Sequence, residues 1–215
     1  MDIIEIEPEE KIKMKKFKFS CDEGCKGIPA PLPNVLRFNM GLIGKAGSGK
    51  TSLLMNLVCK RGKIYNKKFD KVYVFSPSLR SMDDCPFDKL PEEQLYDELN
   101  VENLTGVIDE ITDSGEKILI IFDDVVNDMN KNAELERILC KLLMNRRHIA
   151  GYGGGISTII TSQVYNKIPC AIRKTFSVMI LMNTKQKREL DTIYDEHILV
   201  RENNLILYVS IVIRI

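Results

Sequence analysis

The segment that decides the fold spans residues 44–51 and reads Gly44-Lys45-Ala46-Gly47-Ser48-Gly49-Lys50-Thr51. It matches G-x-x-x-x-G-K-[S/T], a glycine-rich turn whose backbone N–H groups can surround phosphate oxygens. An apolar run at 36–43 precedes the turn, and an apolar helical run at 53–58 follows it. The motif needs this context, a strand before the turn and a helix whose N-terminus faces the same anion. The segment therefore predicts a phosphate-binding loop, formed by residues 44–51 together with Ser52.

Two side chains of this loop carry chemistry. Lys50 brings a positive charge to the β and γ phosphates of a nucleotide, and the hydroxyl of Thr51 is placed to ligate magnesium. A glycine-rich turn between a strand and a helix can also be only a tight connection. The Lys-Thr pair at the end of the turn favours phosphate binding, so ATP and Mg²⁺ are the expected cofactors.

A second segment, residues 117–124, reads KILIIFDD and ends in two adjacent carboxylates. Its apolar part predicts a central strand buried on both faces, and a carboxylate buried at its end is costly unless a cation is nearby. In a P-loop protein the first acid of such a pair orders the magnesium ion, so this role falls to Asp123. Asp124 is then the candidate base that orients or activates the attacking water. The alternative is that the pair only caps the next helix.

Apolar runs typical of strands alternate with helical patterns along the rest of the chain. The expected strands cover residues 36–43, 71–76, 117–123, 157–162 and 177–182. Between the third and fourth, apolar residues from Leu135 to Leu143 recur at helical spacing and predict one amphipathic helix. This alternation predicts an α/β fold with a mostly parallel sheet flanked by helices. Together with the phosphate-binding loop it resembles the P-loop NTPase (RecA/ASCE-like) class.

The two ends of the chain are expected to add smaller elements. The run KIKMKKFKF at 11–19 alternates basic and apolar residues and predicts an edge strand. Prolines at positions 29, 31 and 33 indicate a linker, so we expect residues 1–33 to form an extension and residues 34–215 the P-loop ATPase domain. Two apolar runs, 198–201 and 205–213, predict a C-terminal β-hairpin.

The composition limits the class of protein. The 215 residues are 44% hydrophobic and 28% charged, which suits one compact domain. A net charge of +1 produces no global field for nucleic acid, so any DNA contact must be local. No apolar stretch approaches the roughly 20 residues that span a bilayer. The six cysteines are scattered, so we expect free thiols and a protein that is not secreted.

Residues 157–163 read STIITSQ, a strand that ends in polar residues. The carboxyl edge of a parallel sheet is where ligands bind, so these residues are expected beside the nucleotide. Gln163 is the candidate sensor of the γ phosphate, which distinguishes ATP from ADP. A surface amide that follows a strand is the alternative.

Three arginines are candidate catalytic residues that reach into a neighbouring subunit. Arg146 and Arg147 follow the amphipathic helix, and Arg173 follows the segment 168–172. Each can act as an arginine finger, which neutralises charge in phosphoryl transfer, or be an ordinary solvated or salt-bridged arginine. The glycine-rich segment 151–155 between them is expected to be a mobile connection.

Five motifs in order resemble one family. GKAGSGKTSLL, ILIIFDDV, NRRH, IITSQ and IPCAIRKTF are similar to the genome-packaging ATPases of nucleo-cytoplasmic large DNA viruses, the poxvirus type, within the FtsK/HerA superfamily. The likeness runs from about residue 34 to about residue 195. Many relatives in the wider superfamily carry Glu where Asp124 stands, one methylene longer, so the base role is less firmly matched than the magnesium role of Asp123.

The resemblance implies a function that composition and spacing do not reach. It implies a homo-oligomeric ring, a pentamer or hexamer, that translocates double-stranded DNA into a preformed capsid by ATP hydrolysis. Capsid or portal-vertex proteins would be its partners, and the host cytoplasm, at the viral factory, its location. The basic stretches 11–18 and 60–68 are candidate contacts for DNA phosphates or, as charge runs usually are, solvated faces.

Other functions share the phosphate-binding loop. A small GTPase-like switch requires a glycine where Val126 stands, and 183–186 only approximates its guanine-reading motif. A nucleotide kinase requires an arginine-rich lid, which residues 115–129 do not offer. Another P-loop DNA translocase or helicase-like ATPase, and a scaffold that binds ATP without turnover, are the remaining alternatives.

Overall fold

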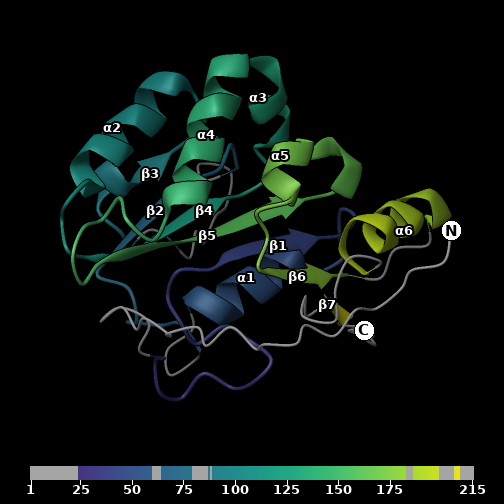
Figure 1. Ribbon diagram of the computed structural model, residues 1–215, viewed down its shortest axis with the longest axis horizontal. Helices are drawn as coiled ribbons and strands as arrows, with labels where there is room; N and C mark the ends of the chain where they lie inside the picture. The colour runs from purple at the N-terminus through teal and green to yellow at the C-terminus, as the bar shows by residue number, and fades with distance from the viewer. Residues whose placement is uncertain are drawn as a thin grey trace, which may run out of the picture.

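The computed structural model describes residues 24–59, 64–78, 87, 89–182, 186–198 and 206–208. Within them, seven strands form one sheet in the order β3-β2-β4-β5-β1-β6-β7, and all the pairings between neighbours are parallel (Figure 1). The strands are β1 (Asn39–Ile43), β2 (Lys71–Phe75), β3 (Leu95–Tyr96), β4 (Lys117–Phe122), β5 (Gly155–Ser162), β6 (Val178–Leu181) and β7 (Ile206–Tyr208). The predicted parallel α/β fold is confirmed.

Helices connect the strands and cover both faces of the sheet. The α-helices are α1 (Lys50–Val58), α2 (Val101–Ile111), α3 (Val126–Lys131), α4 (Ala133–Asn145), α5 (Cys170–Arg173) and α6 (Lys187–Ile193). Shorter turns are the 3₁₀ helices η3 (Glu92–Gln94) and η4 (Tyr165–Lys167) and the π-helical η5 (Tyr194–Ile198). In Figure 1, α2, α3, α4 and α5 lie on one side of the sheet and α1 lies on the other.

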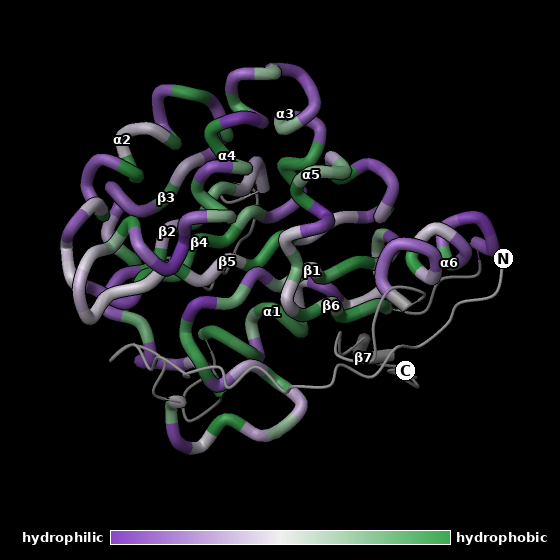
Figure 2. Tube along the Cα trace, viewed as in Figure 1, coloured by the Kyte–Doolittle hydropathy of each residue, from purple (hydrophilic) through white to green (hydrophobic). Residues whose placement is uncertain are grey.

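Two hydrophobic clusters hold these layers together. One packs the predicted apolar stripe of α4, with Leu135, Leu139 and Leu143 at most 2% exposed, against β4 and α2. The other packs Leu54 and Leu57 of α1 against the opposite face. The central strands β4 and β5 therefore lie between two apolar layers, as the hydrophobic colouring of the sheet in Figure 2 shows. Burial on both faces explains why β4 reads as a nearly continuous apolar run.

Residues 27–33 contain no helix or strand, as the linker prediction requires, and they are fastened to the core. The Cys25 N–H donates to Asn34 O at 2.7 Å, and Tyr65 Oη donates to Pro33 O at 2.8 Å. The predicted edge strand at 11–19 lies outside the described residues. The division into an extension and an ATPase domain at residue 33 stays a prediction.

The C-terminal segment differs from the predicted hairpin in its first half. Ile198, the expected start of a strand, is the last residue of the helical turn η5. The turn is favoured there because it buries His197, which is 7% exposed, against Tyr165. In the second half, β7 pairs in parallel with β6. The other residues of the predicted hairpin, 199–205 and 209–213, lie outside the described residues.

Candidate functional site

The phosphate-binding loop lies at the carboxyl end of β1, between the ends of β5 and β6. The Gly44 N–H donates to Ser162 O at 3.0 Å, which fixes the start of the loop to the end of β5. Gly47 and Gly49 have φ angles of 72° and 89°, in the left-handed region that favours glycine. A Cβ at Gly44 would lie 2.4 Å from Met182 Cβ, so only glycine fits without displacement. The loop thus requires its glycines for both conformation and space.

The loop offers donors to an anion. Helix α1 begins at Lys50, and its N-cap residue Gly49 provides no side-chain cap for the N–H groups of the first turn. The Ser48 hydroxyl is buried and has no hydrogen-bond partner among the described residues. Unpaired donors at a helix N-terminus, together with a buried unpaired hydroxyl, fit a phosphate group. The observed loop therefore fits the predicted ligand.

Lys50 lies over this loop and is 9% exposed. Its Nζ donates to Gly44 O at 2.6 Å and to Lys45 O at 3.1 Å. Burial lowers the pKa of Lys50, and the charges of Asp124 and Asp123 oppose that shift. The ammonium group is therefore desolvated and interacts with both carboxylates, and a bound polyphosphate would favour its charged form further.

Asp123 directly follows β4 and is 6% exposed. Thr161 Oγ1 donates to its Oδ1 at 2.7 Å, and Ser76 Oγ donates to its Oδ2 at 3.1 Å. Both carboxylate oxygens are thus oriented by hydroxyls from the two strands that flank β4. A carboxylate held in this way, with the hydroxyl of Thr51 on the first turn of α1, is the oxygen donor set that Mg²⁺ prefers. The residues present fit the predicted ion.

Asp124 leaves the sheet in a left-handed conformation, with a φ of 56°. Its N–H donates to Thr161 Oγ1 at 3.0 Å, and its exposed carboxylate accepts from Gln163 Nε2 at 2.7 Å. A non-glycine residue in this conformation costs roughly 1–3 kcal/mol, and Asp is one of the residues that tolerate it. The structure therefore brings the predicted base and the predicted γ-phosphate sensor into direct contact.

Arg146 and Arg147 lie far from this loop in the same subunit. Arg146 O accepts the N–H of Ile156 near the start of β5, so both arginines are at the amino edge of the sheet. Arg146 Nε donates to Arg37 O at 2.7 Å, and its Nη1 donates to Leu143 O at 2.9 Å. Burial, and then the charge of Arg147, lowers the pKa of Arg146. Arg147 is exposed.

Arg173 is 9% exposed, and its guanidinium is engaged within the subunit. Its Nη2 forms an ion pair with Glu196 Oε1 at 2.9 Å, and its Nη1 donates to Asn166 Oδ1 at 3.1 Å. The structure thus assembles Lys50, Asp123, Asp124 and Gln163, but it places the three arginines elsewhere in the subunit. Their action in a neighbouring subunit stays a prediction.

Sequence reasoning gave no role to the two residues that hold the Asp123 carboxylate, Ser76 and Thr161. Each occupies the polar end of an apolar strand run, KVYVFS and IITS, and that pattern is visible in the sequence. Their contact with Asp123 could not be predicted from the sequence, because it depends on the register between strands. The register that pairs Phe122 of β4 with Ile160 of β5 places Thr161 beside Asp123.

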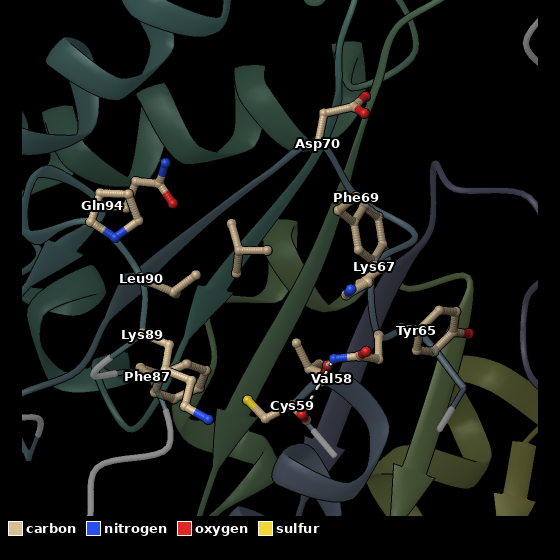
Figure 3. A pocket seen from close by; sticks show the side chains of 13 residues that line it. Val58, Cys59, Tyr65, Lys67, Phe69, Asp70, Phe87, Lys89, Leu90 and Gln94 are labelled. Atoms are coloured by element: carbon tan, nitrogen blue, oxygen red, sulfur yellow. Dashed lines mark hydrogen bonds between the residues drawn. The ribbon is translucent and has the colours of Figure 1, made fainter. Parts of the chain in front are cut away.

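A separate hollow of about 380 Å³ lies beneath the end of α1. Phe69 and Phe87 face it from opposite sides, and Lys67 and Lys89 are among its polar lining residues (Figure 3). Lys67 belongs to the basic stretch 60–68, but none of the predicted nucleotide-site residues lines this hollow, so it is distinct from the phosphate-binding loop.

Comparison with known proteins places the chain in a family. Residues 39–149, just over half of the chain, match the NACHT domain. The chain belongs to the NACHT domain family. It is therefore a P-loop NTPase, and the matched region contains the phosphate-binding loop, Asp123 and Asp124 but ends before Gln163. A search of curated proteins found no significant match.

Solved structures share the fold of this NACHT chain. The DNA-packaging ATPase B204 of Sulfolobus turreted icosahedral virus is 17% identical with a TM-score of 0.52, over 74% of this chain and 82% of B204. B204 of Sulfolobus turreted icosahedral virus 2, in complex with AMP, is 14% identical with a TM-score of 0.51, over 75% of this chain and 82% of that protein. The cytoplasmic domain of EssC is 18% identical with a TM-score of 0.54, over 73% of this chain and 33% of that domain. At these identities the likeness shows the fold.

Two further features bear on the class of protein. In the part of the chain that the structure describes, no helix is both long and apolar enough to cross a membrane. Nor do those residues contain a group of three or more His, Cys, Asp or Glu side chains suited to a metal ion. Of the six cysteines predicted to be free thiols, Cys25, Cys140 and Cys170 are free, and Cys21 and Cys85 lie outside the described residues.

Proposed function

We propose that this NACHT P-loop NTPase is an ATP-hydrolysing motor that translocates double-stranded viral DNA into a preformed capsid. The observation that carries hydrolysis is the contact between Asp124 and Gln163, beside an Asp123 whose two oxygens are already oriented. The motor activity is supported by the ordered motifs shared with poxvirus-type packaging ATPases and by the fold shared with the packaging ATPase B204.

In this mechanism the loop holds the phosphates, and Lys50 exchanges its carbonyl partners for β and γ oxygens. Thr51 and Asp123 would hold Mg²⁺, which supplies charge neutralisation at the transferring phosphate. Asp124 orients a water and takes its proton as the water oxygen bonds to the γ phosphorus and the bond to ADP breaks. Gln163 holds the Asp124 carboxylate in place and senses whether the γ phosphate is present.

A ring would allow a neighbour to complete the site. The phosphate-binding loop is at the carboxyl edge of the sheet, and Arg146 and Arg147 are at the amino edge. If the amino edge of one subunit faces the carboxyl edge of the next, exposed Arg147 is the arginine best placed to reach the neighbour's γ phosphate. Hydrolysis in one subunit would then depend on contact with the next, as a sequential motor requires.

The remaining parts of the proposal concern partners and location. Because the net charge is +1, DNA binding would rest on local basic segments rather than on a global field. Capsid or portal-vertex proteins in the host cytoplasm would dock the ring. The alternative is another P-loop DNA translocase or helicase-like ATPase.

The test is steady-state ATP hydrolysis by the purified protein with and without long double-stranded DNA, with light scattering to measure its assembly state. We expect DNA to raise turnover several-fold, and only in the oligomeric fraction. The Lys50→Ala variant is the control, because loss of the ammonium should abolish nucleotide binding or turnover. Hydrolysis by a monomer that DNA does not affect, or no hydrolysis in any fraction, would reject the motor.

A further inference from the structure

Tyr165 lies two residues beyond Gln163, in η4, and is completely buried. Its hydroxyl lies 2.6 Å from Glu196 Oε2 and 2.6 Å from His197 Nε2, both in η5. A carboxylate only accepts hydrogen bonds, so the tyrosine donates to Glu196 and the His197 imidazole carries its proton on Nε2. Three polar groups from two distant segments therefore meet at Tyr165, two residues along the chain from the predicted γ-phosphate sensor.

Arg173, from a third segment of the chain, contacts both Tyr165 and Glu196. Its guanidinium lies 4.8 Å from the centre of the Tyr165 ring and forms the ion pair with Glu196. Arg173 Nε is buried and has no hydrogen-bond partner within the described part of the chain. We call Tyr165, Arg173, Glu196 and His197 the Tyr165 cluster.

The backbone around the cluster is also held from two sides. The Tyr165 N–H donates to Glu189 Oε1 of α6 at 2.5 Å. Asn130 Nδ2, in α3, donates to Lys167 O at 2.7 Å and to Val126 O at 2.9 Å. Since α3 begins two residues after Asp124, the segment that carries Gln163 is fixed both to the helix after the predicted base and to the C-terminal helices.

A buried polar cluster of this kind contributes less to the free energy of folding than apolar side chains in the same space would. Desolvating an ion pair offsets much of its attraction, and an unpaired buried guanidinium N–H adds a further cost. Apolar side chains of similar volume would fill the same space at least as well. What the polar cluster provides is a defined position, because its hydrogen bonds fix the orientation of every member.

We propose that the Tyr165 cluster is a positioning device that holds Gln163 against Asp124, so that α6 and η5 set the rate of hydrolysis. This inference rests on the proposed ATPase activity. It gives Arg173 a role within its own subunit, in place of the arginine finger that the sequence suggests. Displacement of the C-terminal helices would release Tyr165 and loosen the Gln163–Asp124 contact.

The first experiment is a double-mutant cycle between Tyr165→Phe and Gln163→Ala, with kcat and KM for ATP as readouts. Tyr165→Phe removes one oxygen and keeps the ring, so we expect kcat to fall about tenfold while KM is unchanged. In the Gln163→Ala background the same substitution should have no further effect, because the position that it fixes is no longer used. Tyr194→Phe is the matched control, because Tyr194 lies in η5 beside the cluster residues but is 49% exposed; this variant should behave as wild type.

The outcomes separate this inference from the proposed function. If the wild type does not hydrolyse ATP, the proposed function fails. If the wild type is active but Tyr165→Phe matches it, or its effect multiplies fully with that of Gln163→Ala, the positioning role fails alone. A melting temperature for each variant identifies loss of folding, and Arg173→Lys then replaces any unfolded Tyr165→Phe in the same cycle.

Arg173 has its own discriminating test. Arg173→Ala subunits, which keep an intact phosphate-binding loop, are mixed with Lys50→Ala subunits, which keep Arg173. A positioning role within the subunit predicts no recovery of hydrolysis in the mixture. Recovery would show that Arg173 acts from a neighbour, and it would overturn the assignment made here.

Discussion

Replacing Thr161 by valine should disturb both Asp123 and Asp124 with almost no change of shape. The Thr161 hydroxyl donates to Asp123 Oδ1 at 2.7 Å and accepts the Asp124 N–H at 3.0 Å. A hydrogen bond to a charged group contributes roughly 1.5–3 kcal/mol, and a backbone N–H left unpaired costs about 1–3 kcal/mol when buried. Because the Asp124 N–H is only partly buried, we expect the free energy of unfolding to fall by about 3 kcal/mol.

That loss should be measurable as heat sensitivity and as slower turnover. For a chain of this size, 1 kcal/mol shifts the melting temperature by about 2–4 °C, so the melting temperature should fall by roughly 10 °C. At 25 °C the folded protein should show a kcat reduced on the order of 100-fold, since both the proposed magnesium ligand and the proposed base lose their orientation. Differential scanning calorimetry and steady-state hydrolysis measure the two effects separately.

Thr158→Val is the matched control. Thr158 is on the same strand and equally buried, and its Oγ1 donates to Asn39 Oδ1 at 2.9 Å, away from the carboxylates. This neutral hydrogen bond contributes about 1 kcal/mol, so the control should lose a little stability and no activity. The reasoning is refuted if Thr161→Val melts and hydrolyses like the wild type, or if Thr158→Val loses as much activity.

Three further predictions follow from the same contacts. Asp124→Asn should bind ATP without hydrolysing it, because the amide cannot accept the proton of the attacking water. Rapid filtration with labelled ATP should show undiminished ATP binding and no ADP. Chelation of Mg²⁺ by EDTA should abolish hydrolysis, and restored Mg²⁺ should recover it, whereas activity that persists in EDTA would contradict the ligand role of Asp123. Burial lowers the pKa of His197 below its ordinary value of 6.5; the charge of Glu196 opposes this shift, and the charge of Arg173 adds to it. The imidazole of the folded chain therefore binds a proton more weakly than that of the unfolded chain. The stability that neutral His197 provides is complete above pH 6.5 and is lost as the pH falls below 6.5. Urea titrations at pH 7.5 and 5.5 measure the free energy of unfolding, and its change between the two pH values should be smaller for His197→Gln than for the wild type.

The sequence predicted those parts of the site that depend on local rules. A loop that needs glycine, and a long apolar run that ends in two acids, leave a pattern in neighbouring residues, and these predictions located Lys50, Asp123 and Asp124 where they lie. The parallel sheet followed for the same reason, because strands buried on both faces are apolar throughout. The two-residue strand β3 was missed, since a segment so short has no periodicity to read.

Contacts between distant segments could not be predicted in this way. Arg173 and Glu196 are separated by more than twenty residues, and nothing near either of them indicates that they form a buried ion pair. Arg173 was therefore indistinguishable from an exposed arginine finger. The apolar run that begins at Ile198 was read as a strand, although its first residue ends a helical turn, because a short apolar run fits either structure until its packing is known.

The end of β5 connects all parts of the proposed mechanism. Ser162 O accepts the N–H of Gly44 at the start of the phosphate-binding loop. The preceding Thr161 donates to the Asp123 carboxylate and accepts the Asp124 N–H, and Gln163, which follows Ser162, donates to the Asp124 carboxylate. Tyr165 then fixes the same stretch of backbone to α6 and η5. A shift of this strand end cannot alter one contact alone, because the three residues are consecutive and share their peptide units. Loss of the γ phosphate would therefore change the contacts of Gln163 and, because Tyr165 belongs to the same stretch of backbone, the contacts of the C-terminal helices. These shared contacts would couple hydrolysis to movement of another part of the chain.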